Sequence, residues 1–166
     1  MSYYNPLFHY GLEKLAHDAA AAGFDGILAS DLTVEESGPF VAAMKTAGLN
    51  TVFLVAPTSS PERIRKIAAT STGFLYAVSR TGVTGERQEL AADLRDFLKT
   101  LRTHTSIPIA VGFGISQPEQ VQAVWQEADG AVVGSALVRL IEESAGLPDV
   151  AERVARFTLW LRGEAE

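Results

Sequence analysis

The 166-residue sequence contains no cysteine, which excludes disulfide bonds, thiolate metal sites and cysteine nucleophiles. It has no apolar run close to the ~18 residues of a membrane span, and no basic N-terminal region followed by an apolar one. Lysine and arginine total 14 against 20 aspartate and glutamate, a net charge of −6, and no basic cluster is longer than residues 63–66. We therefore expect a cytoplasmic protein that binds neither nucleic acid nor membranes.

Short runs of aliphatic and β-branched residues recur along the chain and predict strands. They lie at residues 26–29, 51–55, 73–78, 108–112 and 130–134. Each run is apolar throughout, which is typical of strands that are buried on both faces in a parallel sheet. Segments with helical spacing alternate with these runs, at residues 10–22, 34–47, 62–70, 91–103, 119–128, 134–142 and 149–162. The alternation predicts βα units with five parallel strands and covering helices.

Three segments that follow strands have the pattern of a capping box, at residues 33–36, 59–62 and 116–119. We expect these to begin helices and to have no ligand. No linker divides the chain, so we predict one domain over residues 1–162 and a frayed end at residues 163–166. The length falls well short of the ~250 residues of a complete (β/α)₈ barrel.

Glycine-containing loops follow the last three predicted strands, at residues 79–85, 112–116 and 134–136. Gly85, Gly114 and Gly134 lack side chains, so backbone N–H groups there can approach phosphate oxygens. Ser135 adds a hydroxyl at the start of a short helix, whose dipole favours an anion. Each glycine alone is better explained as a turn residue, but the three loops together predict a phosphate site.

Other candidate residues have both a structural and a functional interpretation. Arg80 would contact a phosphate or a mobile loop, or else form a salt bridge with a nearby glutamate. A tyrosine inside a strand, as Tyr76 is, is more often a core aromatic than a ligand contact, and Tyr3 has the same two interpretations. We interpret Asp31, at the end of the first strand, as a cap or turn residue. His9, His17 and His104 have no partners at ligand spacing, and we predict no metal site.

Several motifs occur together in one order, and in that order they resemble the tryptophan synthase alpha chain. They are residues 3–6, 31–36, 56–59, 79–85, 111–116 and 133–136. The resemblance covers essentially the whole chain, and the segments Ser79–Gly85 and Gly112–Ser116 are its most specific parts.

The resemblance implies a (β/α)₈ lyase that cleaves indole-3-glycerol phosphate into indole and glyceraldehyde 3-phosphate. It implies a partner beta chain that carries pyridoxal phosphate, and no cofactor on this chain. By matching motif, the substrate phosphate would be held by Gly85, Gly114, Gly134 and Ser135. Tyr3, Leu28, Tyr76 and Phe113 would line the indole and glycerol pocket, and Arg80 and Thr84 would lie in the loop that closes over the substrate.

The same resemblance also implies a departure. The family's catalytic glutamate and aspartate lie in segments without a counterpart here, and residues 1–3 correspond to the end of the family's third strand. We therefore expect a partial (β/α)₈ barrel with five strands, a strand stub and open sheet edges that favour a homodimer or a complementing partner. We expect no lyase activity from the chain alone. The alternative functions are a non-catalytic phosphate-binding half-barrel and, third, a scaffold without a ligand.

Overall fold

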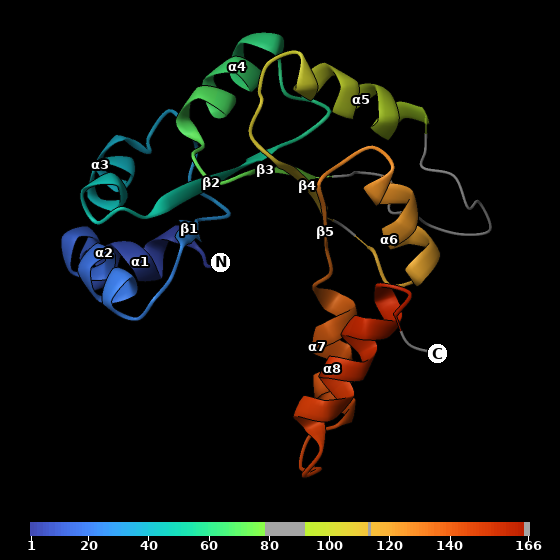
Figure 1. Cartoon of the computed structure of the whole chain (residues 1–166). Helices are drawn as coiled ribbons and strands as arrows, with labels where there is room; N and C mark the ends of the chain where they lie inside the picture. Colours follow the sequence, from blue (N-terminus) through green and yellow to red (C-terminus); the bar gives the residue numbers. More distant parts are fainter. Residues whose placement is uncertain (79–91, 113, 165–166) are drawn as a thin grey trace. The chain divides into compact units, whose positions relative to one another are not determined.

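The computed structural model describes residues 1–78, 92–112 and 114–164, drawn in colour in Figure 1. The chain divides into two compact units. One comprises residues 1–76 and 101–109, and the other comprises residues 77–100 and 110–166. The hydrogen-bonded order of the strands follows the chain, β1-β2-β3-β4-β5.

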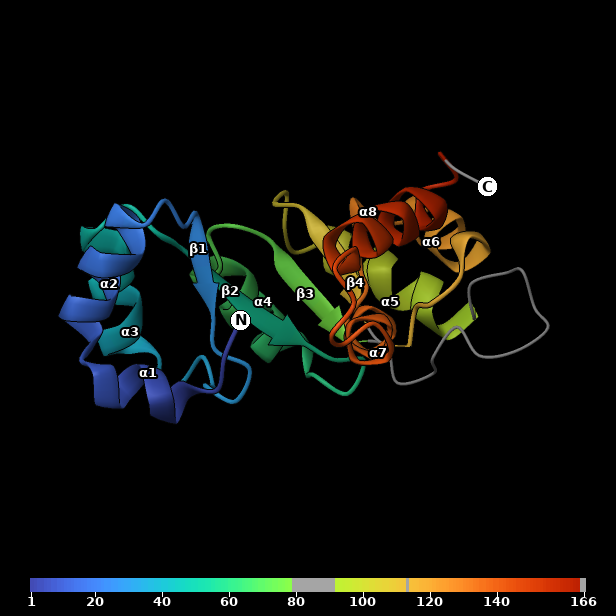
Figure 2. The same ribbon diagram turned by 90° about the horizontal axis from the view of Figure 1, so that it is seen from below.

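The first unit contains strands β1 (Gly26–Leu28) and β2 (Asn50–Val55), and its end includes the start of β3 (Leu75–Val78). β1 and β2 are parallel, with Gly26 opposite Asn50 and Leu28 opposite Val52. The helices of this unit are α1 (Tyr4–Tyr10), α2 (Leu12–Ala21), α3 (Gly38–Thr46) and α4 (Pro61–Thr70). Helices α2 and α3 pack together beside β1 and β2, as both views show (Figures 1 and 2).

Burial of one face of each helix holds this unit together. Phe40 and Met44 are one turn apart on α3, and both are fully buried. Ile64, Ile67 and Ala68 form the buried face of α4 at the i, i+3, i+4 spacing of an amphipathic helix. Each large apolar side chain removed from water in this way contributes about 1.5–3 kcal/mol. Both α3 and α4 contact β2.

The second unit contains β5 (Gly130–Val132), α6 (Pro118–Trp125), α7 (Ser135–Glu143) and α8 (Val150–Leu161). α5 (Ala92–Arg102) and β4 (Ile109–Gly112) lie mostly in it. β4 and β5 are parallel, with Gly112 opposite Val132. Burial is uneven here, because α6 buries Val121 and Val124 whereas no residue of α7 is buried.

The predicted fold class is confirmed, with five parallel strands in an α/β arrangement that matches a partial (β/α)₈ barrel. The predicted strand stub is also present. Ser2 pairs in parallel with Ala29, the Ser2 N–H donates to the Leu28 carbonyl at 3.0 Å, and the Ser30 N–H donates to the Ser2 carbonyl at 2.9 Å. That residues 1–162 form one domain stays a prediction.

Two predicted helix boundaries are wrong. The helix expected over residues 10–22 is α2, which begins only at Leu12, because Gly11 adopts a φ of 92° that no right-handed helix can continue through. Helix α1, before Gly11, was not predicted. The helix expected over residues 34–47 begins at Gly38, and Thr33 contacts the Glu36 side chain instead of capping a helix. Pro39 explains this second error, since a proline ring is tolerated in the first helical turn but clashes with the preceding turn further in.

The other two predicted capping boxes do lie at the starts of helices, but the residues that make the capping hydrogen bonds differ from those predicted. At α4 the cap is Ser60, whose hydroxyl accepts from the Arg63 N–H at 3.3 Å, and not Ser59. At α6 the Gln120 side chain accepts from the N–H groups of Ser116 and Gln117 at 2.7 and 3.1 Å.

A membrane crossing would need a longer and more apolar helix than any in the described part of the chain.

The packing of β1 against β2 leads to a stability prediction. A Cβ at Gly26 would lie 2.6 Å from the Asn50 carbonyl oxygen, too close for any real contact. We expect Gly26→Ala to lower the free energy of unfolding by about 1–3 kcal/mol, the usual cost of overpacking. The measurement is urea unfolding followed by circular dichroism.

The matched control is Gly38→Ala, because a Cβ there meets no atom within 4 Å and the helix gains a better helix former. Equal destabilisation by both substitutions would contradict the steric argument.

Candidate functional site

The N-terminus of α7 in the second unit has the features of an anion site. α7 begins at Ser135, directly after Gly134, and has no acidic residue in its first turn. The first N–H groups of a helix have no partner within it, and its dipole places partial positive charge there. Ser135 is exposed, and a Cβ at Gly134 would meet no atom within 4 Å. The backbone N–H donors at the N-terminus of α7 therefore face open space.

Gly114 reaches the same edge of the sheet. Because Gly112 pairs with Val132 in parallel register, Gly114 and Gly134 each follow the paired residues by two positions. Gly114 is exposed and has a φ of 70°, a conformation that L side chains rarely adopt. The structure thus places three of the four predicted phosphate residues, Gly114, Gly134 and Ser135, at one edge of the second unit.

Four predicted site residues lie outside the described residues. They are Arg80, Thr84, Gly85 and Phe113.

The remaining predicted substrate residues belong to the first unit. Leu28 is 7% exposed within β1, and Tyr3 is 69% exposed at the N-cap of α1. Tyr76 is half-buried in β3, and this burial raises the pKa of its hydroxyl above the ordinary value. At neutral pH the Tyr76 hydroxyl is therefore protonated and available as a hydrogen-bond donor.

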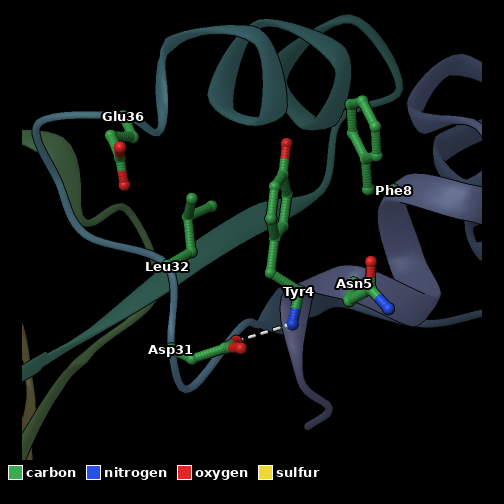
Figure 3. Close-up of a pocket in the computed structure, with 6 residues that line it drawn as sticks. All are labelled: Tyr4, Asn5, Phe8, Asp31, Leu32 and Glu36. Carbon is green, nitrogen blue, oxygen red and sulfur yellow. Dashed lines mark hydrogen bonds between the residues drawn. The ribbon is translucent and has the colours of Figure 1, made fainter.

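A cavity at the carboxyl end of β1 was missed by sequence reasoning (Figure 3). It has a volume of about 430 Å³ and is lined by Tyr4, Asn5, Phe8, Asp31, Leu32 and Glu36. Aromatic rings from α1 face the loop after β1 across it, and the Tyr4 ring also packs edge-on against Phe40 with centroids 6.2 Å apart. The only local signal was that five of these six residues, all except Phe8, lie in two of the motifs noted above, 3–6 and 31–36.

Asp31 in this cavity acts as a helix cap, as we expected, but for a different helix. Its Oδ1 accepts a hydrogen bond of 2.6 Å from the N–H of Tyr4, the first residue of α1. A carboxylate at a helix N-terminus satisfies a free donor and complements the helix dipole. Asp31 therefore ties α1 to the end of β1 across 27 positions of sequence.

No candidate metal centre emerges from the residues that the structure describes, since nowhere in them do three or more histidine or carboxylate side chains gather.

Comparison with known proteins decides the family. The family model for the tryptophan synthase alpha chain matches residues 1–161. This chain belongs to the tryptophan synthase alpha chain family.

Curated alpha chains are similar over nearly the whole sequence. The alpha chain of Solibacter usitatus is 50% identical over 161 residues, which are 97% of this chain and 60% of that relative. The alpha chain of Methanosarcina mazei is 47% identical over 157 residues, 94% of this chain and 57% of the relative. The chain thus spans about 60% of the length of the curated alpha chains it matches.

Solved structures agree with this assignment. A structure of the tryptophan synthase a2b2 complex from Pyrococcus furiosus superimposes with a TM-score of 0.85 and 38% identity, over 97% of this chain and 64% of that one. A structure of Mycobacterium tuberculosis tryptophan synthase gives a TM-score of 0.81 and 37% identity, over 96% of this chain and 60% of that one. The fold and the family therefore agree.

The role of Asp31 leads to a prediction. We expect Asp31→Ala to lower the free energy of unfolding by about 1 kcal/mol, because the Tyr4 N–H loses its acceptor. Asp31→Asn keeps an acceptor oxygen in the same place and should lose much less. Urea unfolding of both variants tests this, and equal stability of all three proteins would show that the cap contributes nothing.

Proposed function

We propose that this chain holds the phosphate of indole-3-glycerol phosphate for the alpha chain reaction, the aldol cleavage of that substrate to indole and glyceraldehyde 3-phosphate. The observation that carries the proposal is the N-terminus of α7. Its donors face open space, no acidic side chain lies in its first turn, and Gly114 follows the neighbouring strand at the same edge. Family membership supports the choice of a phosphorylated substrate for this site.

The residues at this edge suit a phosphate dianion. The N–H groups of Ser135 and Ala136 and the Ser135 hydroxyl would donate hydrogen bonds to its oxygens. The absence of a side chain at Gly134 and Gly114 would let the phosphate approach the backbone. Gly85, by its motif, would add a further donor. Binding energy from a phosphate that does not itself react can be used to position the bond that breaks.

The remaining predicted residues would contact the rest of the substrate. We assign Tyr3, Leu28, Tyr76 and Phe113 to the indole and glycerol pocket, and Arg80 and Thr84 to the loop that closes over it. The protonated Tyr76 hydroxyl would serve as a donor to a substrate oxygen.

Cleavage of a carbon–carbon bond by the retro-aldol route needs a general acid and a general base. We propose that this chain supplies neither, since the resemblance assigns the catalytic glutamate and aspartate to segments without a counterpart here, and Asp31 is engaged as a cap. Lyase activity would then require the rest of an alpha chain. We further propose a cytoplasmic location and a beta chain partner, with pyridoxal phosphate on that partner and no cofactor on this chain.

The phosphate site leads to a binding prediction. Gly134→Asp places a negative charge and a side chain at the N-terminus of α7, so we expect the affinity for glyceraldehyde 3-phosphate to fall at least about tenfold. Isothermal titration calorimetry measures this.

The matched control is Gln126→Glu, which adds the same charge at an exposed position of the same unit and should leave the affinity unchanged. If the unaltered chain bound no phosphate ligand at millimolar concentration, the scaffold interpretation would replace the proposal.

Catalysis is tested separately. We expect no indole release from indole-3-glycerol phosphate by the 166-residue chain alone. Release should appear when it is mixed with a second polypeptide made from the part of the Solibacter usitatus alpha chain outside the match. Substantial release by the pure chain would overturn the assignment of the acid and base to other segments. If the mixture released no indole but still bound phosphate, the result would favour the non-catalytic phosphate-binding half-barrel.

A further inference from the structure

Helix α7 presents apolar surface that its neighbour leaves uncovered. Within the second unit, α7 contacts α8, and the two helices lie side by side (Figures 1 and 2). No residue of α7 is buried, and Val138 and Ile141 are 54% and 46% exposed. Leu137 and Leu140 are covered only in part. The apolar side of α7 is therefore wider than the surface that covers it in the described part of the chain.

The exposed apolar and small residues of α7 form a narrow seam along the helix. Val138 and Ile141 are three positions apart, and the exposed residues Gly134 and Ala145 continue the line four positions before and after them. Gly134 directly precedes α7, and Ala145 lies in the turn after it. Steps of four, three and four residues are the spacing with which one helix packs along another in a coiled coil. These four residues are named the α7 seam below.

Two opposite charges border the α7 seam on one side. A helix turns by about 100° per residue, which places Glu142 about 40° and Arg139 about 100° away from Val138. Glu143, by the same rotation, lies on the far side of α7 from the seam. All three charged residues are exposed, and none of them forms an ion pair within the residues that the structure describes.

Two copies of the α7 seam complement each other when the helices are antiparallel. A two-fold axis that places Val138 opposite Ile141 of a second copy also places Gly134 opposite Ala145. In this register, Glu142 of one copy lies about 3 Å along the helix axis from Arg139 of the other, on the same side of the seam. Two-fold symmetry repeats the contact, so the pair of helices gains two pairs of opposite charges.

We propose that the α7 seam is a self-association surface, at which two copies of this chain pack their α7 helices antiparallel. Charge complementarity selects the second copy as the occupant, because an identical seam supplies both opposite charges at matching positions. The seam is short and the net charge of −6 opposes association, so we expect a weak dimer in the micromolar range. Neither Arg139 nor Glu142 belongs to the phosphate site, so a test without a phosphate ligand is independent of the proposed function.

The first test is sedimentation equilibrium of the full chain between about 5 and 500 µM, the range in which a small interface associates. We expect the average mass to rise from monomer toward dimer. Arg139→Glu or Glu142→Arg alone turns each attractive pair into a repulsive one, so the Kd of either variant should rise at least about tenfold. The matched control is Glu143→Arg, which makes the same charge change one position away and outside the seam. Its Kd should stay within about twofold of the unaltered chain.

Mixing the two variants tests whether the charges meet between molecules. In a heterodimer of Arg139→Glu with Glu142→Arg, both pairs again join opposite charges, so a dimer should return that neither variant forms alone. The Arg139→Glu chain carries a fluorophore at its N-terminus, and sedimentation velocity follows its mass as the unlabelled variant is added. The Glu143→Arg chain, added in the same way, should not bind the labelled chain. Contacts within one molecule cannot produce this difference.

Three results would each overturn the proposal. The first is a chain that keeps the circular dichroism spectrum of a folded protein and stays monomeric up to about 500 µM. If the Solibacter usitatus polypeptide then bound it with an affinity that the same reversals lowered, the occupant of the seam would be the remainder of an alpha chain. The second is a dimer that both reversals leave unchanged, which would assign association to another surface, such as an open sheet edge. The third is equal binding of the labelled chain to the Glu142→Arg and Glu143→Arg chains.

Discussion

Parallel pairing of neighbouring strands in register is the constraint on which the candidate sites depend. It places the residues that follow each strand at the same sheet edge, so Gly114 and Gly134 share an edge because Gly112 is opposite Val132. In the first unit the same geometry directs the chain after β1 toward α1, where Asp31 meets the Tyr4 N–H. The helices bury apolar side chains, whereas the register of the strands decides which loop residues lie side by side.

The sequence predicted those parts of the structure that depend on local pattern. Apolar runs located all five strands, and Gly134 and Ser135 could be found because a glycine and a serine at a helix start are adjacent in the chain. The helix boundaries at Gly11 and Pro39 were missed because periodicity was given more weight than the backbone conformations that these two residues favour. Both residues were visible in the sequence.

Contacts between distant segments were beyond local reasoning. The bond between Asp31 and Tyr4 spans 27 positions, and no spacing rule connects an aspartate after one strand with the first residue of an earlier helix. The cavity lined by Tyr4, Phe8 and Leu32 was missed for the same reason, since its walls meet only once the first unit is folded. Family resemblance indicated that these segments matter, and the structure indicates how they touch.

The shallow burial of α7 gives its N-terminus a second physical consequence. A helix without a buried residue is held mainly by its own hydrogen bonds and by its contact with α8, so local unfolding there costs little free energy. An anion that binds only the folded helix would shift that local equilibrium toward order by mass action. Phosphate, if it binds there as proposed, would then act on this chain as a folding ligand that orders this end of the helix.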